Sequence, residues 1–334
     1  MAADSSPPQP TTIQKLATVV YPSFAMLAGM QLDLFTPLKD GPMTAAELAN
    51  ALGVKAEKLS PLLYALVSAA LLTVDGDDFA NTPEADHYLV QGKPTYMGGR
   101  HGIFSQRWHA VMKTAVSIQT GEPQAPLDFA EDQPDELEAF FRRYHTETLP
   151  RGRELVQRFD LSSAQTLVDI GGGSGGLAIA ITEALPHIQA TVVDLPTVTP
   201  ITQRFVDEAG ATDRVHVLAA NVVNETLPET FDVAVLSSFI QVLTPEEACR
   251  ALTHVFQALN PGGTVYIRGQ VLDNSRVSPS EIVALSLFFI NAFRKGAAYT
   301  EQEYTDWLTE AGFVDVERTA LPDKQSFIRA RKPA

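Results

Sequence analysis

Hydrophobic residues in the first part of the chain recur at the spacing of an α-helix. Over residues 13–38 they return every three or four positions, and Pro22 marks a helix start or a break within this stretch. A second, shorter amphipathic helix is predicted over 43–54. It begins with Thr44 and Glu47 at the spacing of a capping box, in which each side chain binds the backbone amide of the other residue.

The next stretches complete a winged helix-turn-helix pattern. Residues 56–72 predict another helix, and residues 73–83 predict a hairpin around the Asp75–Gly76 turn. Two helices followed by such a hairpin are typical of DNA-binding modules. However, residues 39–90 contain eight acidic and three basic side chains, a net charge of −5 that phosphate would repel. We therefore expect this region to pack or to form a dimer, not to bind nucleic acid.

The pattern changes in the second half of the chain. Short runs rich in β-branched residues alternate with helical stretches, which predicts an α/β fold with a parallel, doubly wound sheet. The last two runs are separated by only three residues and must therefore form an antiparallel hairpin. The five expected parallel strands are 166–170, 190–194, 215–219, 232–238 and 264–269, and the hairpin strands are 314–321 and 325–332.

The region between the two halves is predicted to be helical. Residues 95–120 and 134–158 have helical patterns and are joined by a loop rich in proline and acidic residues. The expected organisation is a disordered tail at 1–12, a winged-helix dimerisation domain at 13–95, linking helices at 96–158 and a Rossmann-like sheet domain at 159–334.

The composition narrows the functional classes. The 334 residues carry 25 Lys and Arg against 40 Asp and Glu, a net charge of −15, which disfavours binding to nucleic acid or to an anionic membrane. The single cysteine, Cys249, excludes a disulfide framework. The seven scattered histidines lack metal-ligand spacing, so no metal is expected. We find neither a signal peptide nor a membrane-spanning run and expect a cytoplasmic protein.

The strongest motif is the glycine-rich sequence at 168–176, which follows a predicted strand and precedes a predicted helix. Glycines let such a turn bend tightly and let its backbone approach a ligand. The spacing of Gly171, Gly173 and Gly176 also fits a dinucleotide-binding loop. Asp169 favours another ligand, because a carboxylate directed into the loop would repel a pyrophosphate and attract a cation.

A second acidic residue, Asp194, ends the next strand and is placed to bind both hydroxyls of a ribose. The D-x-G-G-G-x-G sequence from Asp169, the VVDLP and PGGTVYI sequences and the final hairpin together resemble the class I S-adenosylmethionine (SAM)-dependent methyltransferases. With its N-terminal winged helix, the chain is similar to the small-molecule O-methyltransferase family that includes plant caffeate and bacterial polyketide enzymes. The resemblance begins at about residue 15. It implies SAM as cofactor and S-adenosylhomocysteine as product.

The resemblance also implies the residues that bind the cofactor. Gly171 and Gly173 would approach its methionine part, with Asp169 nearby, while Asp194 and Leu195 would contact the ribose and the adenine. Three further positions complete this expected set: Asn221, where the family usually has aspartate, the following Val222, and Ser237, where the family often has lysine.

The general base of typical members is absent from this chain. Their His-Asp-Trp segment supplies the histidine that deprotonates the acceptor hydroxyl, but Gln241, Val242 and Leu243 occupy those places here. Glutamine cannot take up a proton, and a general base contributes about 10²–10⁴-fold in rate. The substitution therefore favours a thioether, an acidic hydroxyl, a carboxylate or a thiolate as acceptor. The alternative is a base from elsewhere, for which His145 is the main candidate, so Gln241 and His145 are the expected catalytic positions.

Several residues are expected to contact the acceptor. By resemblance, Tyr144 and His145 lie on a helix that faces the acceptor pocket. Arg268 ends an apolar strand, where it either holds a substrate carboxylate or lies at the edge of the sheet. Phe104 and Trp108 at helical spacing are further candidates, with a core position as the alternative. Asn291, within an apolar run, either orients a substrate or caps a turn, and Tyr299 is the last candidate.

Three functions remain open at this point. The leading hypothesis is a SAM-dependent methyltransferase of small molecules that dimerises through 13–38 and 56–72, whose apolar surface exceeds what the domain can cover alone. A second keeps the fold but uses bound SAM as a fixed positive charge that promotes a pericyclic or elimination step. A third is a winged-helix regulator without enzymatic activity, which requires the nucleic-acid binding that the local charge opposes.

Overall fold

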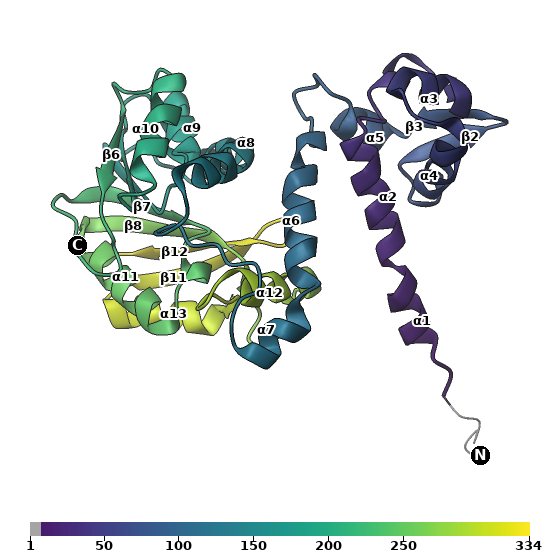
Figure 1. Ribbon diagram of the computed structural model, residues 1–334. Coiled ribbons are helices and arrows are strands. Elements are labelled where there is room, and N and C mark those ends of the chain that lie inside the picture. The colour runs from purple at the N-terminus through teal and green to yellow at the C-terminus, as the bar shows by residue number, and fades with distance from the viewer. Residues whose placement is uncertain (1–7) are drawn as a thin grey trace. The chain divides into compact units, whose positions relative to one another are not determined.

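The computed structural model describes residues 8–334, and the chain divides into two compact units, Met1–Gln106 and Arg107–Ala334 (Figure 1). The tail expected at 1–12 lies mostly outside the described residues, and the first helix, α1, already begins at Thr11. In the part of the chain that is described, no helix is both long enough and apolar enough to cross a bilayer.

The first unit is mostly helical, as predicted. The helices α1 (Thr11–Thr18) and α2 (Val20–Gln31) cover most of the first helical pattern. Pro22 lies in the first turn of α2, where a missing amide costs no helical hydrogen bond. The capping box before α3 is confirmed: Glu47 donates its amide to the Thr44 hydroxyl and accepts from the Thr44 amide. The other helices of this unit are η1 (Pro37–Asp40), α3 (Ala45–Leu52), α4 (Ala56–Ser68), α5 (Pro83–Leu89) and η2 (Gly98–Arg100).

A small antiparallel sheet follows the helices α3 and α4. The strands β2 (Leu72–Asp75) and β3 (Asp78–Asn81) form the predicted hairpin, and the two-residue strand β1 (Met43–Thr44) pairs with β3. The hairpin buries Leu72 and Phe79 against the helices, which explains why it stays folded on this small unit.

Several apolar side chains of α1 and early α2 are exposed to solvent. Ile13, Leu16 and Tyr21 are 72%, 63% and 65% exposed, and Val19 and Val20 lie between them in the sequence. The core of the unit forms elsewhere, around buried residues of η1, α3 and α4. An apolar surface of this kind is typical of a protein–protein contact.

A seven-stranded sheet forms the centre of the second unit, in the order β11-β12-β8-β7-β4-β5-β6. The five strands from β8 to β6 in this order are parallel, and β12 runs antiparallel between β8 and β11, as the sequence predicts. The strands are β4 (Thr166–Ile170), β5 (Gln189–Asp194), β6 (Val215–Ala219), β7 (Phe231–Ser237), β8 (Leu259–Gly269), β11 (Val314–Ala320) and β12 (Ser326–Arg331).

Helices cover both faces of this sheet (Figure 1). The helices α8, α9 and α10 pack on one face, and α11 and α13 pack on the other. The approach of α8 to α9 requires a glycine, because a Cβ atom on Gly152 would lie 2.5 Å from the Leu177 carbonyl oxygen. The helix α6 (His101–Val111) contains the boundary between the two units in the sequence. The other helices of the second unit are α7 (Thr114–Thr120), α8 (Pro134–Arg158), α9 (Gly176–Ala184), α10 (Thr199–Glu208), η3 (Ile240–Val242), α11 (Pro245–Gln257), α12 (Ser280–Ala292) and α13 (Glu301–Ala311).

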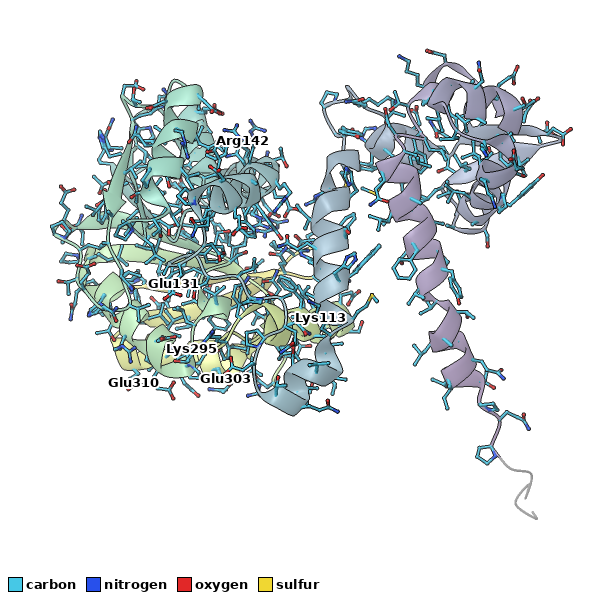
Figure 2. The ribbon with its side chains drawn as sticks, viewed as in Figure 1. Lys113, Glu131, Arg142, Lys295, Glu303 and Glu310 are labelled. Carbon is cyan, nitrogen blue, oxygen red and sulfur yellow. The ribbon has the colours of Figure 1, made fainter. Side chains whose placement is uncertain are left out.

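Two features of the second unit go beyond the predicted elements. The two-residue strands β9 (Val271–Leu272) and β10 (Tyr299–Thr300) form a separate parallel pair, too short to leave a pattern in the sequence. Ion pairs lie on the surface: Arg142 of α8, labelled in Figure 2, pairs with Glu138 at 2.9 Å. Such exposed pairs contribute little to stability, so the burial of apolar side chains on both faces of the sheet holds this unit together.

Candidate active site

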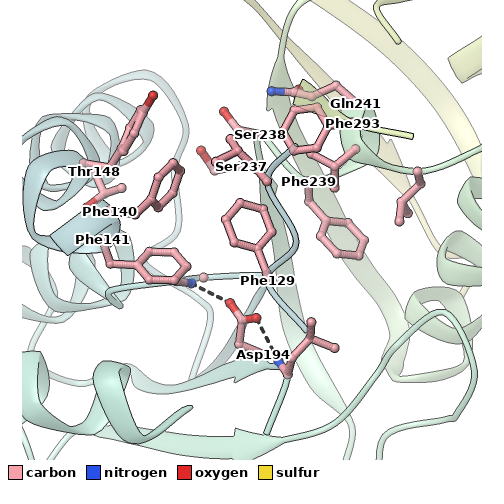
Figure 3. Close-up of a pocket in the computed structure, with 18 of the residues that line it drawn as sticks. Phe129, Phe140, Phe141, Thr148, Asp194, Ser237, Ser238, Phe239, Gln241 and Phe293 are labelled. Carbon is pink, nitrogen blue, oxygen red and sulfur yellow. Dashed lines mark hydrogen bonds between the residues drawn. The ribbon is translucent and has the colours of Figure 1, made fainter. Parts of the chain in front are cut away.

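A cavity of about 380 Å³ lies at the carboxyl ends of the parallel strands of the second unit. Its lining comes from the glycine loop after β4, from the ends of β5 and β7, and from α8, α12 and the segment before α8. The lining combines polar groups with phenylalanine rings, and Phe129 and Phe141 lie close to Asp194 (Figure 3). Open α/β sheets typically bind their ligands at this edge.

The glycine loop joins β4 to the start of α9. Gly171, Gly173 and Gly175 have φ angles of +64°, +57° and +70°, in the left-handed region that favours glycine. A Cβ atom on Gly171 would lie 2.5 Å from the Phe239 ring, and one on Gly173 would lie 2.6 Å from the Phe141 ring. The loop therefore borders the cavity with bare backbone, as a cradle for a closely approaching ligand requires.

Asp194 ends β5 and faces this loop (Figure 3). Its Oδ2 accepts from the Gly173 amide and its Oδ1 from the Leu195 amide, each at 2.8 Å. Burial raises the pKa of Asp194 to about 6, although both amides oppose this effect. A carboxylate has about four acceptor positions, so about two remain for hydroxyl donors such as those of a ribose.

Asp169 lies beneath the loop and lines the cavity with its buried carboxyl group. Within residues 8–334, neither of its oxygens has a hydrogen-bond partner. Burial, with a smaller contribution from the charge of Asp194, raises the pKa of Asp169 to about 7. A buried carboxylate without a partner is costly and is relieved by a cation. The residues present thus fit the ammonium group and the ribose of SAM.

The turn after β6 places Asn221 at the cavity but not Val222. Asn221 lines the cavity, and its Oδ1 accepts from the Val223 amide at 3.1 Å. Val222 is buried in the core, and its carbonyl accepts from His254 Nδ1 at 2.8 Å. Val223 is the apolar residue of this turn that lines the cavity. The expectation that Val222 contacts the cofactor is therefore corrected: the following residue, Val223, takes its place in the lining.

The end of β7 contributes two serines to the lining. Ser237, one of the predicted residues, has a buried hydroxyl oxygen without a partner among the described residues. Ser238 accepts from Arg151 Nη1 at 3.2 Å and has a φ of +59°. Arg151 of α8 also lines the cavity and pairs with Glu147 at 3.2 Å. Arg151 thus places a positive charge beside the position where the family often has lysine.

Aromatic rings make up much of the cavity lining. Gln241 of η3 is 6% exposed and also lines the cavity, with its side-chain Oε1 2.8 Å from the place of a Cβ on Gly269. It carries no titratable group, and the lining contains no histidine. The aromatic lining residues are Phe129, Phe140, Phe141, Tyr144, Phe239, Phe288, Phe289 and Phe293.

His145 does not reach the cavity, which corrects the expectation of a base or a substrate contact at this position. Its Nδ1 lies 2.9 Å from the Ser174 hydroxyl, and its ring stacks on Phe205 at 4.5 Å between centroids. Burial lowers the pKa of His145, so the ring is neutral at pH 7. The residue supports the glycine loop from behind.

Arg268 is buried in the fold and does not line the cavity, so neither expected position was right. Its side chain pairs with Glu154 at 3.3 Å and with Asp323 at 2.9 Å, and it donates to the side-chain Oε1 of Gln325. The terminal hairpin and α8 are thereby joined to the end of β8. We assign Arg268 to the fold and not to the acceptor.

Asn291 and Tyr299 are also core residues outside the lining. The Asn291 amide accepts from Ser117 and donates to Thr114 and to the Leu287 carbonyl, which satisfies it within the helices α7 and α12. The Tyr299 hydroxyl donates to the Leu243 carbonyl oxygen. Both are polar groups buried with their partners, as cores require.

The expected acceptor contacts on α6 and α8 are divided. Tyr144 lines the cavity, as predicted. Phe104 packs against the core of the first unit, and Trp108 does not line the cavity. Sequence reasoning missed Arg107, Arg151, Ser238 and the paired phenylalanines Phe140 and Phe141. In the part of the chain that is described, no group of three or more His, Cys, Asp or Glu side chains is placed to hold a metal.

Comparisons with known proteins show the family of this chain. Residues 119–314 match the O-methyltransferase domain family, and residues 14–91 match the O-methyltransferase dimerisation domain. The chain is 30% identical to the tetracenomycin polyketide synthesis 8-O-methyl transferase TcmO of Streptomyces glaucescens, over 97% of each chain. It is also 30% identical to a 3-hydroxy-5-methyl-1-naphthoate 3-O-methyltransferase of Streptomyces sahachiroi, over 97% of this chain and 95% of the relative.

The same fold occurs in a solved structure that contains the cofactor. Human N-acetylserotonin methyltransferase in complex with SAM has a TM-score of 0.82 to this chain, with 22% identity and full coverage of both chains. The domain match covers more than half of the chain, and the bacterial relatives align with it almost from end to end. The protein therefore belongs to the O-methyltransferase family and is a SAM-dependent methyltransferase of small molecules.

Proposed function

We propose that this methyltransferase acts on an aromatic small molecule and transfers the methyl group to a hydroxyl that ionises readily. The carrying observation is a cavity whose lining, among the described residues, combines phenylalanine rings with Gln241 and contains no histidine. The two bacterial relatives are named as O-methyltransferases, one in polyketide synthesis and one of a hydroxylated naphthoate, which supports an aromatic hydroxyl over a thioether or a carboxylate.

The polar part of the cavity holds the cofactor in this proposal. Asp169 pairs with the ammonium group of its methionine part, and the backbone at Gly171 and Gly173 allows the close approach. Asp194 binds the ribose hydroxyls. Leu195, Asn221, Val223 and Ser237 complete the cofactor contacts.

Alignment replaces base catalysis in this cavity. Bound SAM supplies an electrophilic methyl group on a positively charged sulfur. The acceptor oxygen forms a bond to the methyl carbon while the carbon–sulfur bond breaks, and its electron pair remains on the sulfur of S-adenosylhomocysteine. Proximity and alignment contribute about 7–11 kcal/mol, more than the roughly 3–5 kcal/mol of a general base. An acceptor that is already ionised therefore needs only to be held in line.

A series of aromatic hydroxyl acceptors of one size and graded acidity tests this function. We expect kcat/KM at pH 7 to rise with the acidity of the acceptor. For acceptors whose pKa lies above 7, the ionised fraction increases about tenfold for each unit by which the pKa is lower. Methylated product and S-adenosylhomocysteine should appear in equal amounts. Aromatic amines and thioethers of the same size serve as controls. Rates independent of acidity, or methylation of amines alone, would contradict the proposal, and turnover without S-adenosylhomocysteine would indicate non-methylating chemistry.

We also propose a homodimer formed through α1 and α2. The dimerisation-domain match at residues 14–91 and the exposed apolar residues of these helices support it. Leu16→Glu should shift the sedimentation equilibrium toward the monomer, because it places a charge within the apolar surface. Gln14→Glu adds the same charge at a polar position of α1 and should leave the dimer intact. A monomeric wild-type protein at micromolar concentration would refute this assembly.

A further inference from the structure

Arg107 is a cation among the aromatic rings of the cavity, and it has no role in the function proposed above. It lies on α6 and lines the cavity. Its Nη2 is 3.5 Å from the Tyr144 hydroxyl, at the limit of a hydrogen bond, and its buried Nε has no partner among the described residues. Over residues 8–334, no carboxylate pairs with it.

Two aromatic rings hold the Arg107 guanidinium in place. Its central carbon lies 5.8 Å from the ring centroid of Tyr144 and 5.8 Å from that of Phe288. Such contacts fix the plane of the group but use few of its five N–H donors. Because arginine keeps its proton at any ordinary pH, the cavity contains a permanent positive charge with donors to spare.

The other charged groups of the lining are matched within the fold or belong to the cofactor site. Arg151 pairs with Glu147, and Glu247 pairs with Lys295 at 2.8 Å. Arg107 is thus the lining cation for which the described residues supply no counter-charge. The remaining ionisable lining residues are Tyr144, Asp169 and Asp194.

We propose that Arg107 binds the acceptor hydroxyl in its ionised form and so takes over the task of the missing base. The inference rests on the proposed function, methylation of an aromatic hydroxyl. The hydroxyl proton passes to water when the acceptor binds. A lone pair of the resulting oxyanion then forms the bond to the methyl carbon, and the electron pair of the broken carbon–sulfur bond stays on sulfur. Arg107 also explains how a phenylalanine-lined cavity can accept an anion at all.

The expected effect is large enough to replace much of a base. An opposite charge within about 4–6 Å lowers the pKa of an acidic group by about 1–3, which increases the ionised fraction at neutral pH by about 10- to 1,000-fold. This range overlaps the about 10²–10⁴-fold contribution of a general base. The phenylalanine rings strengthen the attraction, because they lower the local dielectric constant.

The pKa of a bound phenol tests this role without requiring turnover. The probe is 7-hydroxycoumarin, whose phenol and phenolate forms absorb at different wavelengths. It is titrated with pH in the presence of S-adenosylhomocysteine, whose neutral sulfur adds no positive charge of its own. We expect its pKa to be about 1–3 lower in the wild-type complex than in water. Arg107→Gln should abolish this shift, and Arg107→Lys should keep most of it.

Arg153→Gln is the matched control, because Arg153 lies on α8, is 57% exposed and does not line the cavity. It should leave the shift unchanged. A wild-type complex in which hydroxycoumarin keeps its solution pKa would overturn the role of Arg107, and so would an unchanged shift in Arg107→Gln. Loss of binding in Arg107→Gln with retention in Arg107→Lys supports the role. Loss in both variants would show that Arg107 only packs, and would also overturn it.

Kinetics separate this inference from the proposed function. For a weakly acidic phenol, Arg107→Gln should shift the rising limb of the profile of kcat/KM against pH to higher pH by about 1–3 pH units. For a strongly acidic phenol, the same substitution should cause little loss of kcat/KM at neutral pH. If the pKa shift of the bound phenol depends on Arg107 but the protein methylates no hydroxyl, the anion site stands and the proposed function is refuted. If the protein methylates hydroxyls and the pH profile does not change in Arg107→Gln, the proposed function stands and the role of Arg107 is refuted.

Discussion

Replacing Asp169 with asparagine should stabilise the cofactor-free protein while weakening its binding of SAM. Asp169 is 1% exposed, and its carboxylate oxygens have no partner within residues 8–334. Burial and the neighbouring Asp194 raise its pKa from 3.8 to about 7. At about 1.36 kcal/mol per pKa unit, ionised Asp169 costs the folded state about 4 kcal/mol above pH 7.

The sign of this effect follows from proton binding. Between pH 3.8 and about pH 7 the folded state holds the Asp169 proton more tightly than the unfolded state does, so stability falls as the pH rises through this window. Asparagine carries no charge and removes this dependence. The advantage of Asp169→Asn should therefore grow by about 2–3 kcal/mol between pH 5 and pH 8.

Urea unfolding at pH 5 and pH 8 measures this difference, with tryptophan fluorescence as the signal, because Trp108 and Trp307 both lie in the second unit. Calorimetric titration with SAM should show an affinity at least about tenfold lower, because a charge-assisted contact contributes about 1.5–3 kcal/mol. A variant that is less stable than the wild type at pH 8, or one that binds SAM with full affinity, would refute this account of Asp169.

The control is Asp232→Asn on β7. Burial alone would raise the pKa of Asp232, but hydrogen bonds from Gln165, Asn260 and Thr166 together hold it below its ordinary range. Because these bonds favour the charged form, Asp232 contributes stability above its unfolded pKa, and the contribution is lost as the pH falls. Its removal should destabilise the protein at pH 8 and leave SAM affinity unchanged.

Three further substitutions test the other assignments. Asp194→Ala should weaken SAM binding at least about tenfold in calorimetric titration, and an unchanged Kd would remove the ribose assignment. Gln241→Ala should change kcat by less than about tenfold, because this side chain moves no proton; a loss of about a thousandfold would give it a catalytic role. Arg268→Ala should lower the free energy of unfolding by about 2–3 kcal/mol, less than for a fully buried pair because Asp323 is half exposed. A raised KM for the acceptor would instead return Arg268 to the substrate site.

The part of the cavity lining at the strand ends was largely predictable, because strand ends can be read from the sequence. A short β-branched run defines its own end in the sequence, and the carboxyl ends of parallel strands meet at one edge of the sheet. Asp169, Asp194 and Ser237 lie at or near such ends and all line the cavity. The turn after β6 was misjudged by one residue, because its conformation depends on a bond from the Val223 amide to Asn221 and on one from the distant His254 of α11 to the Val222 carbonyl.

The helical part of the lining was not predictable, because tertiary packing selects the helix face that meets the cavity. The residues of α8 that line the cavity, such as Phe141, Tyr144, Thr148 and Arg151, recur every three or four positions and form one face. His145 is adjacent to Tyr144 in the sequence but faces Ser174 and Phe205. The spacing alone identifies a face and does not reveal which face meets the acceptor.

Arg268 shows a second limit of sequence reasoning. A charged residue that ends an apolar strand is typical of both a ligand site and a buried ion pair. The partners Glu154 and Asp323 are 114 and 55 residues away in the sequence. Only the hairpin β11–β12 and the helix α8, once folded against β8, bring these charges together.

A fixed cation in place of a base changes how the enzyme discriminates between hydroxyls. A base removes the proton as the bond forms, so it assists strong and weak acids alike. With Arg107 as proposed, the proton is gone before transfer, and each pKa unit between two hydroxyls of one acceptor changes the population of the reactive form about tenfold. The lower nucleophilicity of the more acidic oxygen offsets only part of this factor. The site should therefore select among the hydroxyls of one aromatic acceptor by acidity as well as by shape.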